Sequence, residues 1–391
     1  MAGAGWRQFT VGQLLTSAQV QTFLQDQSVQ VHASAAARTS ALGTAVSEGM
    51  VSYRADDKAL ELYAGSAWQP VMQGRNAIIN GGFDFWQRGT SFAHTSGNIY
   101  GADRWGCYRA AFATGATSSR QSPGLQGFQY SARVQRDSGN SSTAAIRFTQ
   151  AFETSDSIRF AGQTVTLSFY ARKGANYTDT ASNLNAVVFS GTGTNQNPWG
   201  GFTGASNAIN SNAVLSNSWT RYSFSGTVNS NANQLCIEFS YIPVGTAGAN
   251  DWFEITGVQL EAGSVATPFI RAATTLQGEL AACQRYYQRF TAFTAFNFLS
   301  IFGSATSTTN VQLNIPLLAS LRVIPTSVGF SNLTVSDGPN NNAVSNLTID
   351  VNTNRDLVTL NATSTGLTQF RPYCLRANNT TAAFFEINSE L

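Results

Sequence analysis

Hydrophobic and polar residues alternate along most of the chain from residue 76 to residue 271, as in strands that bury one face. Turn-forming clusters such as Ser138–Ser141 separate the alternating runs, and no helical stretch lies between them. The clearest runs are Val165, Leu167, Phe169 and Leu235, Ile237, Phe239, Tyr241. Many short strands spaced by turns predict an antiparallel jelly-roll β-sandwich over residues 74–271.

The hydrophobic period changes to that of a helix after this region. Thr274 with Gln277 fits a capping box, which marks a helix start. Apolar positions then recur at i, i+4, i+7 and i+11, at Leu276, Leu280, Cys283 and Tyr287. We therefore expect a helical junction over residues 272–289 with one apolar seam. Such a seam can dock onto the preceding sandwich, or it can meet copies of itself.

Alternation returns over residues 290–391 and predicts a second, smaller β-sandwich at the C-terminal end. A turn over residues 352–354 separates two of its expected strands. Its apolar positions include Val311, Leu313, Ile315 and Leu347, Ile349, Val351. The predicted fold class is therefore mainly β, with a jelly roll, a smaller sandwich, and short N-terminal and interdomain helices.

Residues 1–73 have a different pattern, which we interpret as an attachment region. Thr16 and Gln19 fit a capping box, and Val20, Phe23 and Leu24 then predict one short amphipathic helix. The Ala-, Ser- and Thr-rich stretch 31–48 has no strong period and predicts an extended connector. Alternation over 49–53 and 60–63, on either side of a polar turn, predicts a small β-hairpin.

Charged residues make up 11% of the chain, whereas a typical soluble protein has about 25%. The formal net charge of +2 gives no field strong enough to recruit nucleic acid or an anionic membrane. No stretch approaches the ~20 apolar residues of a membrane span, and the N-terminus has no signal-peptide pattern. We therefore expect no nucleic-acid partner, no membrane insertion and assembly in a cytoplasm. Low charge density also favours association between copies.

The reactive residue types are sparse and scattered. Cys107, Cys236, Cys283 and Cys374 form no CxxC pair, so we expect buried free thiols. Only two histidines, His32 and His94, occur, and neither has Cys, Asp or Glu at metal-ligand spacing. No acidic cluster suggests the two paired carboxylates of a glycosidase. We therefore expect that the protein is not an enzyme.

Four motifs occur in an order that resembles a known group of proteins. They are NAIINGGFDFWQRG over 76–89, ADRW over 102–105, VQLEAGSVATPF over 258–269 and CQRYYQ over 283–288. Together they resemble tailed-bacteriophage tail fibre or minor virion structural proteins, whose middle domain looks like a carbohydrate-binding-module jelly roll. Residues 49–71 are similar to the N-terminal segment of many of these proteins, so the resemblance covers roughly residues 45–290.

The resemblance implies a structural protein of the virion, assembled in the bacterial host cytoplasm. It favours a homotrimeric tail fibre that attaches to glycans on the host surface, with the N-terminal region contacting other virion proteins. In that arrangement the Leu276 to Tyr287 seam forms a three-helix junction. Two alternatives remain open: a capsid or tail decoration protein without receptor binding, and a polysaccharide-degrading tailspike.

Candidate glycan-binding residues are aromatic side chains in loops, because sugar rings stack on flat apolar surfaces. Trp199 and Phe202 lie in Asn-Gln-Asn-Pro-Trp-Gly-Gly-Phe, and Tyr177 lies in Lys-Gly-Ala-Asn-Tyr, where Gly and Pro disfavour regular strands. For Trp199 the alternative is a ring that caps the end of the sandwich or fills a subunit contact.

One metal is implied by the resemblance. Jelly rolls of the carbohydrate-binding kind often hold a structural calcium through oxygen ligands. Here Asn80, Asp84 and Glu261 are the residues that could supply such ligands. The favoured alternative is a hydrogen-bonded polar latch that ties the ends of the domain together. We expect no other cofactor.

Overall fold

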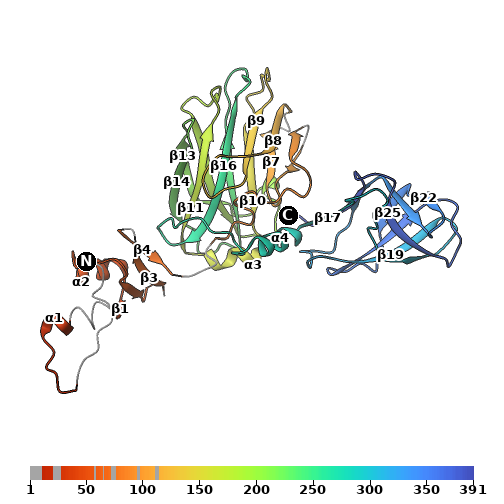
Figure 1. Cartoon of the computed structure of the whole chain (residues 1–391). Helices are drawn as coiled ribbons and strands as arrows, with labels where there is room; N and C mark the ends of the chain where they lie inside the picture. Colours follow the sequence, from red (N-terminus) through yellow and green to blue (C-terminus); the bar gives the residue numbers. More distant parts are fainter. Residues whose placement is uncertain are drawn as a thin grey trace. The chain divides into compact units, whose positions relative to one another are not determined.

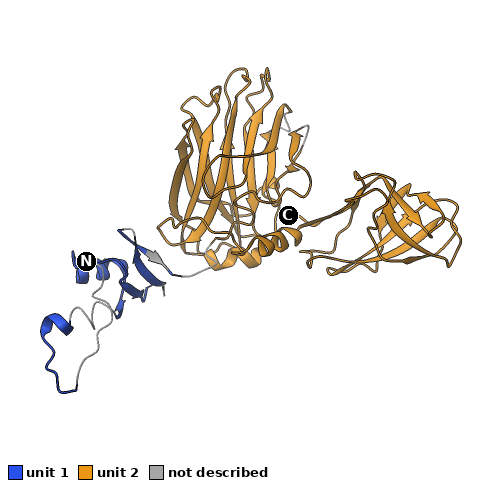
Figure 2. Cartoon of the chain, in the orientation of Figure 1, with its two compact units in different colours: residues 1–75 blue, residues 76–391 orange. Residues whose placement is uncertain are grey.

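The computed structural model describes residues 11–20, 28–56, 59–64, 66–71, 76–94, 97–110 and 114–391. The chain forms two compact units, residues 1–75 and residues 76–391, shown in separate colours in Figure 2. In the described part of the chain, no helix has the length and apolarity needed to cross a bilayer.

The first unit is built on one four-stranded sheet in the order β1-β2-β3-β4. Strands β2 and β3 pair antiparallel at the place of the expected hairpin, and β1 pairs parallel to β2. The elements are α1 (Ser17–Val20), β1 (Val29–His32), α2 (Ala35–Leu42), β2 (Val51–Arg54), β3 (Ala59–Ala64) and β4 (Ala67–Pro70). The fold class predicted from the sequence, mainly β with short helices, holds for this unit.

Helix α1 begins with the predicted capping box. The Gln19 N–H donates to Thr16 Oγ1 over 3.2 Å, and the Thr16 N–H donates to Gln19 Oε1 over 3.1 Å. Phe23 and Leu24, predicted to continue this helix, lie outside the described residues.

The extended connector predicted over 31–48 is wrong, because helix α2 occupies its centre. Ser34 caps this helix by accepting a hydrogen bond from the Ala37 N–H, and the strong helix formers Ala, Arg and Leu follow it.

The second unit contains a jelly roll of two six-stranded sheets, which Figure 1 shows packed face to face. The first sheet has the order β14-β11-β16-β9-β8-β5 and the second sheet has the order β13-β12-β15-β10-β7-β6. The first sheet consists of β5 (Ser91–His94), β8 (Ala116–Gln121), β9 (Ser131–Arg136), β11 (Thr164–Lys173), β14 (Thr220–Thr227) and β16 (Trp252–Ala262). The second consists of β6 (Ile99–Tyr100), β7 (Gly106–Arg109), β10 (Ile146–Ala151), β12 (Asn183–Gly191), β13 (Ser206–Val214) and β15 (Gln234–Tyr241).

The core between these sheets is made by the predicted alternating positions. Trp105 stacks on Phe148 with ring centroids 4.9 Å apart, and Phe239 meets Phe169 edge-on at 4.8 Å. All four side chains are buried. Because every second residue of these strands points into this core, the remaining residues must face outward.

Short helices lie at one end of the jelly roll. Helices α3 (Thr154–Ser157) and α4 (Leu276–Gln284) lie side by side in Figure 1, and Arg285 Nε donates to Glu153 Oε1 over 2.8 Å between them. The N-cap of α4 is Thr275, one residue after the predicted Thr274.

The helix that carries the seam predicted over Leu276 to Tyr287 is shorter than expected, so Tyr287 is not part of it. Helix α4 ends at Gln284, and Tyr287 begins strand β17. Leu276 is exposed and Leu280 is half-buried, whereas Cys283 and Tyr287 are buried within the chain. Tyr287 leaves the helix because its strand pairs with β26, about a hundred residues later in the sequence.

The C-terminal sandwich has a three-stranded sheet, β17-β26-β20, and a seven-stranded sheet, β22-β21-β25-β18-β19-β24-β23. The predicted Val311, Leu313, Ile315 and Leu347 are buried, but Val351 is 96% exposed because β23 ends at Ile349. The strands are β17 (Tyr287–Thr291), β18 (Gly303–Ala305), β19 (Asn310–Pro316), β20 (Val328–Ser331), β21 (Leu333–Ser336), β22 (Asn341–Ala343), β23 (Asn346–Ile349), β24 (Leu357–Thr363), β25 (Pro372–Ala377) and β26 (Phe384–Asn388). The mainly β fold predicted for the whole chain is confirmed.

Candidate functional site

The outer face of the second sheet carries a continuous row of polar side chains across five strands. Its members are neighbours in the strand register and alternate with core residues such as Ala186 and Phe239. In order from β13 to β7 they are Asn212, Asn185, Ser240, Arg147 and Tyr108. Tyr108 and Ser240 are 132 positions apart in the sequence, and the sheet brings the five residues into one line.

A second row lies two residues further along the same strands. From β13 to β6 it contains Asn210, Val187, Glu238, Thr149, Gly106 and Tyr100. Glu238 is the only carboxylate in the two rows. The exposed groups of the rows are the amides of Asn210 and Asn212 and the Arg147 guanidinium, whereas Ser240, Glu238 and Thr149 are buried. The rows lack the pair of carboxylates that glycoside hydrolysis normally requires.

Hydrogen bonds hold these side chains in fixed orientations. Asn185 Nδ2 donates to Asn210 Oδ1 over 2.9 Å and to Asn212 Oδ1 over 3.0 Å. Arg147 Nη1 donates to Glu238 Oε1 over 3.1 Å. Burial raises the pKa of the Glu238 carboxyl, and the neighbouring Arg147 guanidinium opposes that shift. The Arg147 side chain remains 44% exposed, so it can still contact a ligand.

Trp199 stands at one end of the second row. It lies in the short 3₁₀ turn Pro198–Gly200, where the Asn197 side chain caps the turn by accepting from the Trp199 N–H over 2.9 Å. The indole ring lies directly on Gly106, since a Cβ there would come within 2.4 Å of the ring. Tyr100 meets the same ring edge-on, with centroids 5.4 Å apart. Trp199 is half-buried, and its indole N–H has no hydrogen-bond partner within the described residues.

Phe202 and Tyr177 lie in loops, as the sequence predicts, but both rings are buried, contrary to the expectation that they face a ligand. Phe202 packs on Phe189 at a centroid distance of 5.0 Å and closes the end of the second sheet's outer face. Tyr177 stacks on Tyr241 at 4.2 Å, and its hydroxyl donates to the Asn183 carbonyl. Loop composition predicts the backbone correctly but does not reveal which rings a fold covers.

The three expected calcium ligands each have protein partners. Asn80 is fully buried, and its amide donates to the carbonyls of Phe85 and Asp103. Asp84 Oδ2 accepts from Arg271 Nε over 2.8 Å. The described residues contain no group of three or more His, Cys, Asp or Glu side chains placed to hold a metal ion.

The remaining expected ligand, Glu261, accepts hydrogen bonds from both the N–H and the hydroxyl of Thr267. The contact of Asp84 with Arg271 joins the first and last segments of the domain.

Several residues of the two rows were not among the candidates chosen from the sequence. Tyr100, Tyr108 and Arg147 lie in different motifs or in none, and no local pattern links them to Trp199. One signal in the sequence could have pointed to these residues. Asn185 and Glu238 alternate along their strands with buried apolar residues, which predicts that their side chains point to the outer face. Only the register of the strands shows that these outward positions form one surface.

Comparison with known proteins gives matches among solved structures only. No family model matches the sequence, and no curated protein matches it. A CBM4 module is 20% identical, with 48% of this chain and 100% of that chain covered and a TM-score of 0.30. TmCBM61 in complex with β-1,4-galactotriose is 14% identical, covering 48% and 99%, with a TM-score of 0.28.

The enzymatically active domain of bacteriophage CBA120 tailspike protein 4 is also similar. It is 15% identical, covering 48% of this chain and 21% of that chain, with a TM-score of 0.29. Because these identities are below 25% and these TM-scores are below 0.5, they carry no conclusion about ligand or activity.

Proposed function

We propose that the jelly roll binds a glycan on the outer face of its second sheet. The observation that carries this proposal is the pair of in-register rows, which place hydroxyl, amide and guanidinium groups beside the rings of Trp199, Tyr100 and Tyr108. Sugars need both kinds of group, because their ring faces are apolar and their edges carry hydroxyls. The rows cross five strands of this sheet, which suits an extended chain of sugars.

The proposed activity is binding without cleavage. Glu238 is held by Arg147 and has no second carboxylate in the two rows, so the face lacks the acid and base pair of a hydrolase. The side chains are also fixed by hydrogen bonds within the sheet, which reduces the conformational entropy lost when a ligand binds.

The finer part of the proposal is that this chain is a structural protein of a phage virion, where it attaches the particle to host glycans. Support for this part comes from the four sequence motifs alone. Contacts between one face and one glycan are weak, and several copies on one particle would raise the overall affinity through effective concentration. Antibody labelling of intact virions tests this part, and absence of the chain from purified particles would contradict it.

Glycan-array binding of the purified protein tests the binding site. Trp199→Ala should weaken binding about tenfold or more, which corresponds to about 1.4 kcal/mol. Trp219→Ala is the matched control, because Trp219 is also half-buried but lies beside the first sheet, where its indole N–H donates to the Pro123 carbonyl. Equal binding by Trp199→Ala and wild type, or an equal loss in both variants, would contradict the assigned face.

A further inference from the structure

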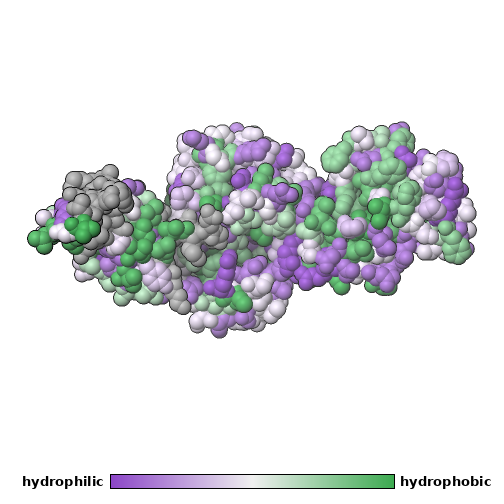
Figure 3. Space-filling model, turned by 60° about the horizontal axis from the view of Figure 1, so that its bottom comes forward, coloured by the Kyte–Doolittle hydropathy of each residue, from purple (hydrophilic) through white to green (hydrophobic). Residues whose placement is uncertain are grey.

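The C-terminal sandwich exposes a group of large apolar side chains that its own core does not use. The segment 292–304 contains no charged residue. Three of its rings are widely exposed: Phe293 at 87%, Phe298 at 59% and Phe302 at 64%. Figure 3 shows apolar surface gathered on this part of the chain. We call Phe293, Phe296, Phe298, Ile301, Phe302 and Leu318 the aromatic patch.

The backbone that presents these rings is fixed by hydrogen bonds. Asn297 Oδ1 accepts from the Phe293 N–H, and the Asn297 carbonyl accepts from the Ala377 N–H, both over 2.9 Å. The Arg376 guanidinium lies 4.8 Å from the ring centroid of Phe296 and 5.2 Å from that of Phe298. The rings are therefore held outward by a defined turn and would lose little entropy on meeting a partner.

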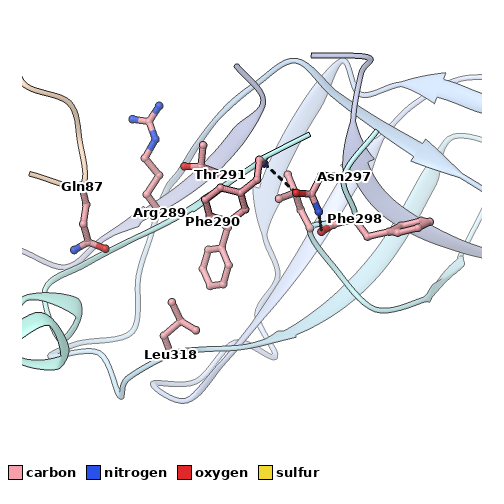
Figure 4. Close-up of a pocket in the computed structure, with 9 residues that line it drawn as sticks. Gln87, Arg289, Phe290, Thr291, Asn297, Phe298 and Leu318 are labelled. Carbon is pink, nitrogen blue, oxygen red and sulfur yellow. Dashed lines mark hydrogen bonds between the residues drawn. The ribbon is translucent and has the colours of Figure 1, made fainter. Parts of the chain in front are cut away.

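A recess of about 610 Å³ opens beside the exposed rings. Phe290, Phe293, Phe298, Leu299 and Leu318 form its apolar walls. Figure 4 shows the Phe290 ring directed toward Leu318, with Asn297 and Phe298 on the neighbouring segment. A protruding ring and an apolar recess thus belong to the same surface, which lets the surface fit a copy of itself.

We propose that this patch is where copies of the chain associate with one another. Taking ~200 Å² for each large apolar side chain when fully exposed, the six side chains of the patch together expose roughly 700 Å². The largest apolar patch of a typical monomer is about 300–600 Å², and one side of a standard protein interface buries about 800 Å². The area therefore fits one half of a specific interface.

The chemistry of the patch also favours a protein partner over a sugar. Interface centres are depleted of charge and enriched in aromatic residues and arginine. The exposed rings have these properties, with Arg376 against Phe296 and Phe298. The polar groups that line the recess, from Gln87, Arg289, Thr291 and Asn297, can bond to the partner copy. The sequence suggested the Leu276 to Tyr287 seam as a contact between copies, but two of its four residues are buried inside the chain. The aromatic patch is the contact that we propose instead.

Sedimentation velocity over a range of concentrations tests the proposal on the full chain. Wild type should form a dimer or trimer, and Phe293→Asp should raise the dissociation constant at least 100-fold, because each interface would bury an unpaired carboxylate. Val351→Asp is the matched control, since Val351 is 96% exposed in the same sandwich but does not line the recess. It should associate as wild type does.

The outcomes separate this proposal from glycan binding. Circular dichroism should show that Phe293→Asp stays folded, and its glycan affinity per site should equal that of wild type. A second variant, Phe298→Asp, should also dissociate. Wild type that remains monomeric at every concentration would overturn the proposal, and so would oligomers that persist unchanged in both aspartate variants.

Discussion

The two outer faces of the jelly roll carry similar polar and aromatic residues. On the first sheet these residues mostly contact one another, whereas on the second sheet several of them are exposed. On the first sheet, the fully buried Glu254 carboxylate lies between Arg133 and Arg172, at 2.6 and 2.7 Å. The two guanidiniums lie 4.2 and 4.7 Å from the ring centroids of Trp252 and Trp219. Each charged or aromatic group on this part of the face already has a protein partner.

Another part of the first face is covered by loops. Phe128 packs on Tyr170 and Phe269 with ring centroids 5.4 and 5.2 Å apart, and Gly257 leaves room for its ring. Thr267 covers Glu261 through two hydrogen bonds. On the second sheet, the Pro198–Gly200 turn lies over Gly106, and the Leu391 carbonyl accepts from the Tyr100 hydroxyl, so the β6–β7 end of the second row is covered. Asn210, Asn212 and Arg147 stay exposed. The first face is therefore largely occupied by loops and internal ion pairs, whereas the second face keeps exposed amide and guanidinium groups, and these are the groups that the proposed function uses.

The largest effect that tests this difference is on stability. Glu254→Gln removes the charge that two partly buried arginines share, so the free energy of unfolding should fall by about 3 kcal/mol. The same change at Glu238, whose partner Arg147 is 44% exposed, should cost less than about 1 kcal/mol. Urea unfolding of both variants measures the two values. Equal losses would mean that the two faces are equally structural.

Acid should act on the first sheet through His94, which is buried in strand β5. Burial, together with the charge of Arg109, lowers the pKa of this imidazole to about 4. The unfolded chain takes up this proton near pH 6.5, so the free energy of unfolding should fall as the pH drops from 6.5 to 4. The part lost through His94 should be on the order of 3 kcal/mol by pH 4.

The measurement compares wild type with His94→Gln in urea at several pH values. Asp103 acts in the opposite direction, because burial raises its carboxyl pKa to about 6 and its protonation then favours the folded state. Only the difference between the two proteins therefore reports His94. Parallel pH profiles would show that the imidazole is not held neutral.

The sequence predicted the strands well because alternation is a local signal. Val165, Leu167 and Phe169 all lie in the core, and the four cysteines are buried free thiols, as expected. The sequence could not show which outward face stays open, because covering depends on contacts between segments far apart. Gln87 and Tyr287 illustrate this, since the Gln87 side chain donates to a carbonyl 200 positions away.

The wrong predictions also come from contacts between segments that are far apart in the sequence. The segment around Tyr177 has the composition of an exposed loop, but Tyr241 of a distant strand covers its ring. Tyr287 fits the helical period of its segment, but it lies in a strand that pairs with β26. The loop position of Trp199 could be predicted because Pro and Gly mark its turn. Its neighbours Tyr100 and Gly106 were not, because only the pairing of β6 with β7 places them beneath its ring.

A smaller effect tests how the second face holds its aromatic ring. In Gly106→Ala the added Cβ would come within 2.4 Å of the Trp199 ring, and the paired strand cannot move away, so the ring must shift. We expect glycan affinity to fall about tenfold, close to the effect of removing the ring. Gly200→Ala in the same turn is the control, because nothing lies within 4 Å of its added Cβ. Unchanged affinity in Gly106→Ala would show that the position of the ring does not matter.

The smallest expected effect concerns a single amide in the first row. Asn185 lies between Asn210 and Asn212 and is partly exposed, so Asn185→Ala should change the free energy of unfolding by no more than about 0.5 kcal/mol. Glycan affinity should still fall about three- to fivefold, because one hydrogen bond to a sugar hydroxyl contributes about 1 kcal/mol. Gln135→Ala, a partly exposed amide on the first sheet, should leave affinity unchanged. If titration calorimetry gives the same affinity for both variants, the first row lies outside the site, and binding is confined to the aromatic end of the face.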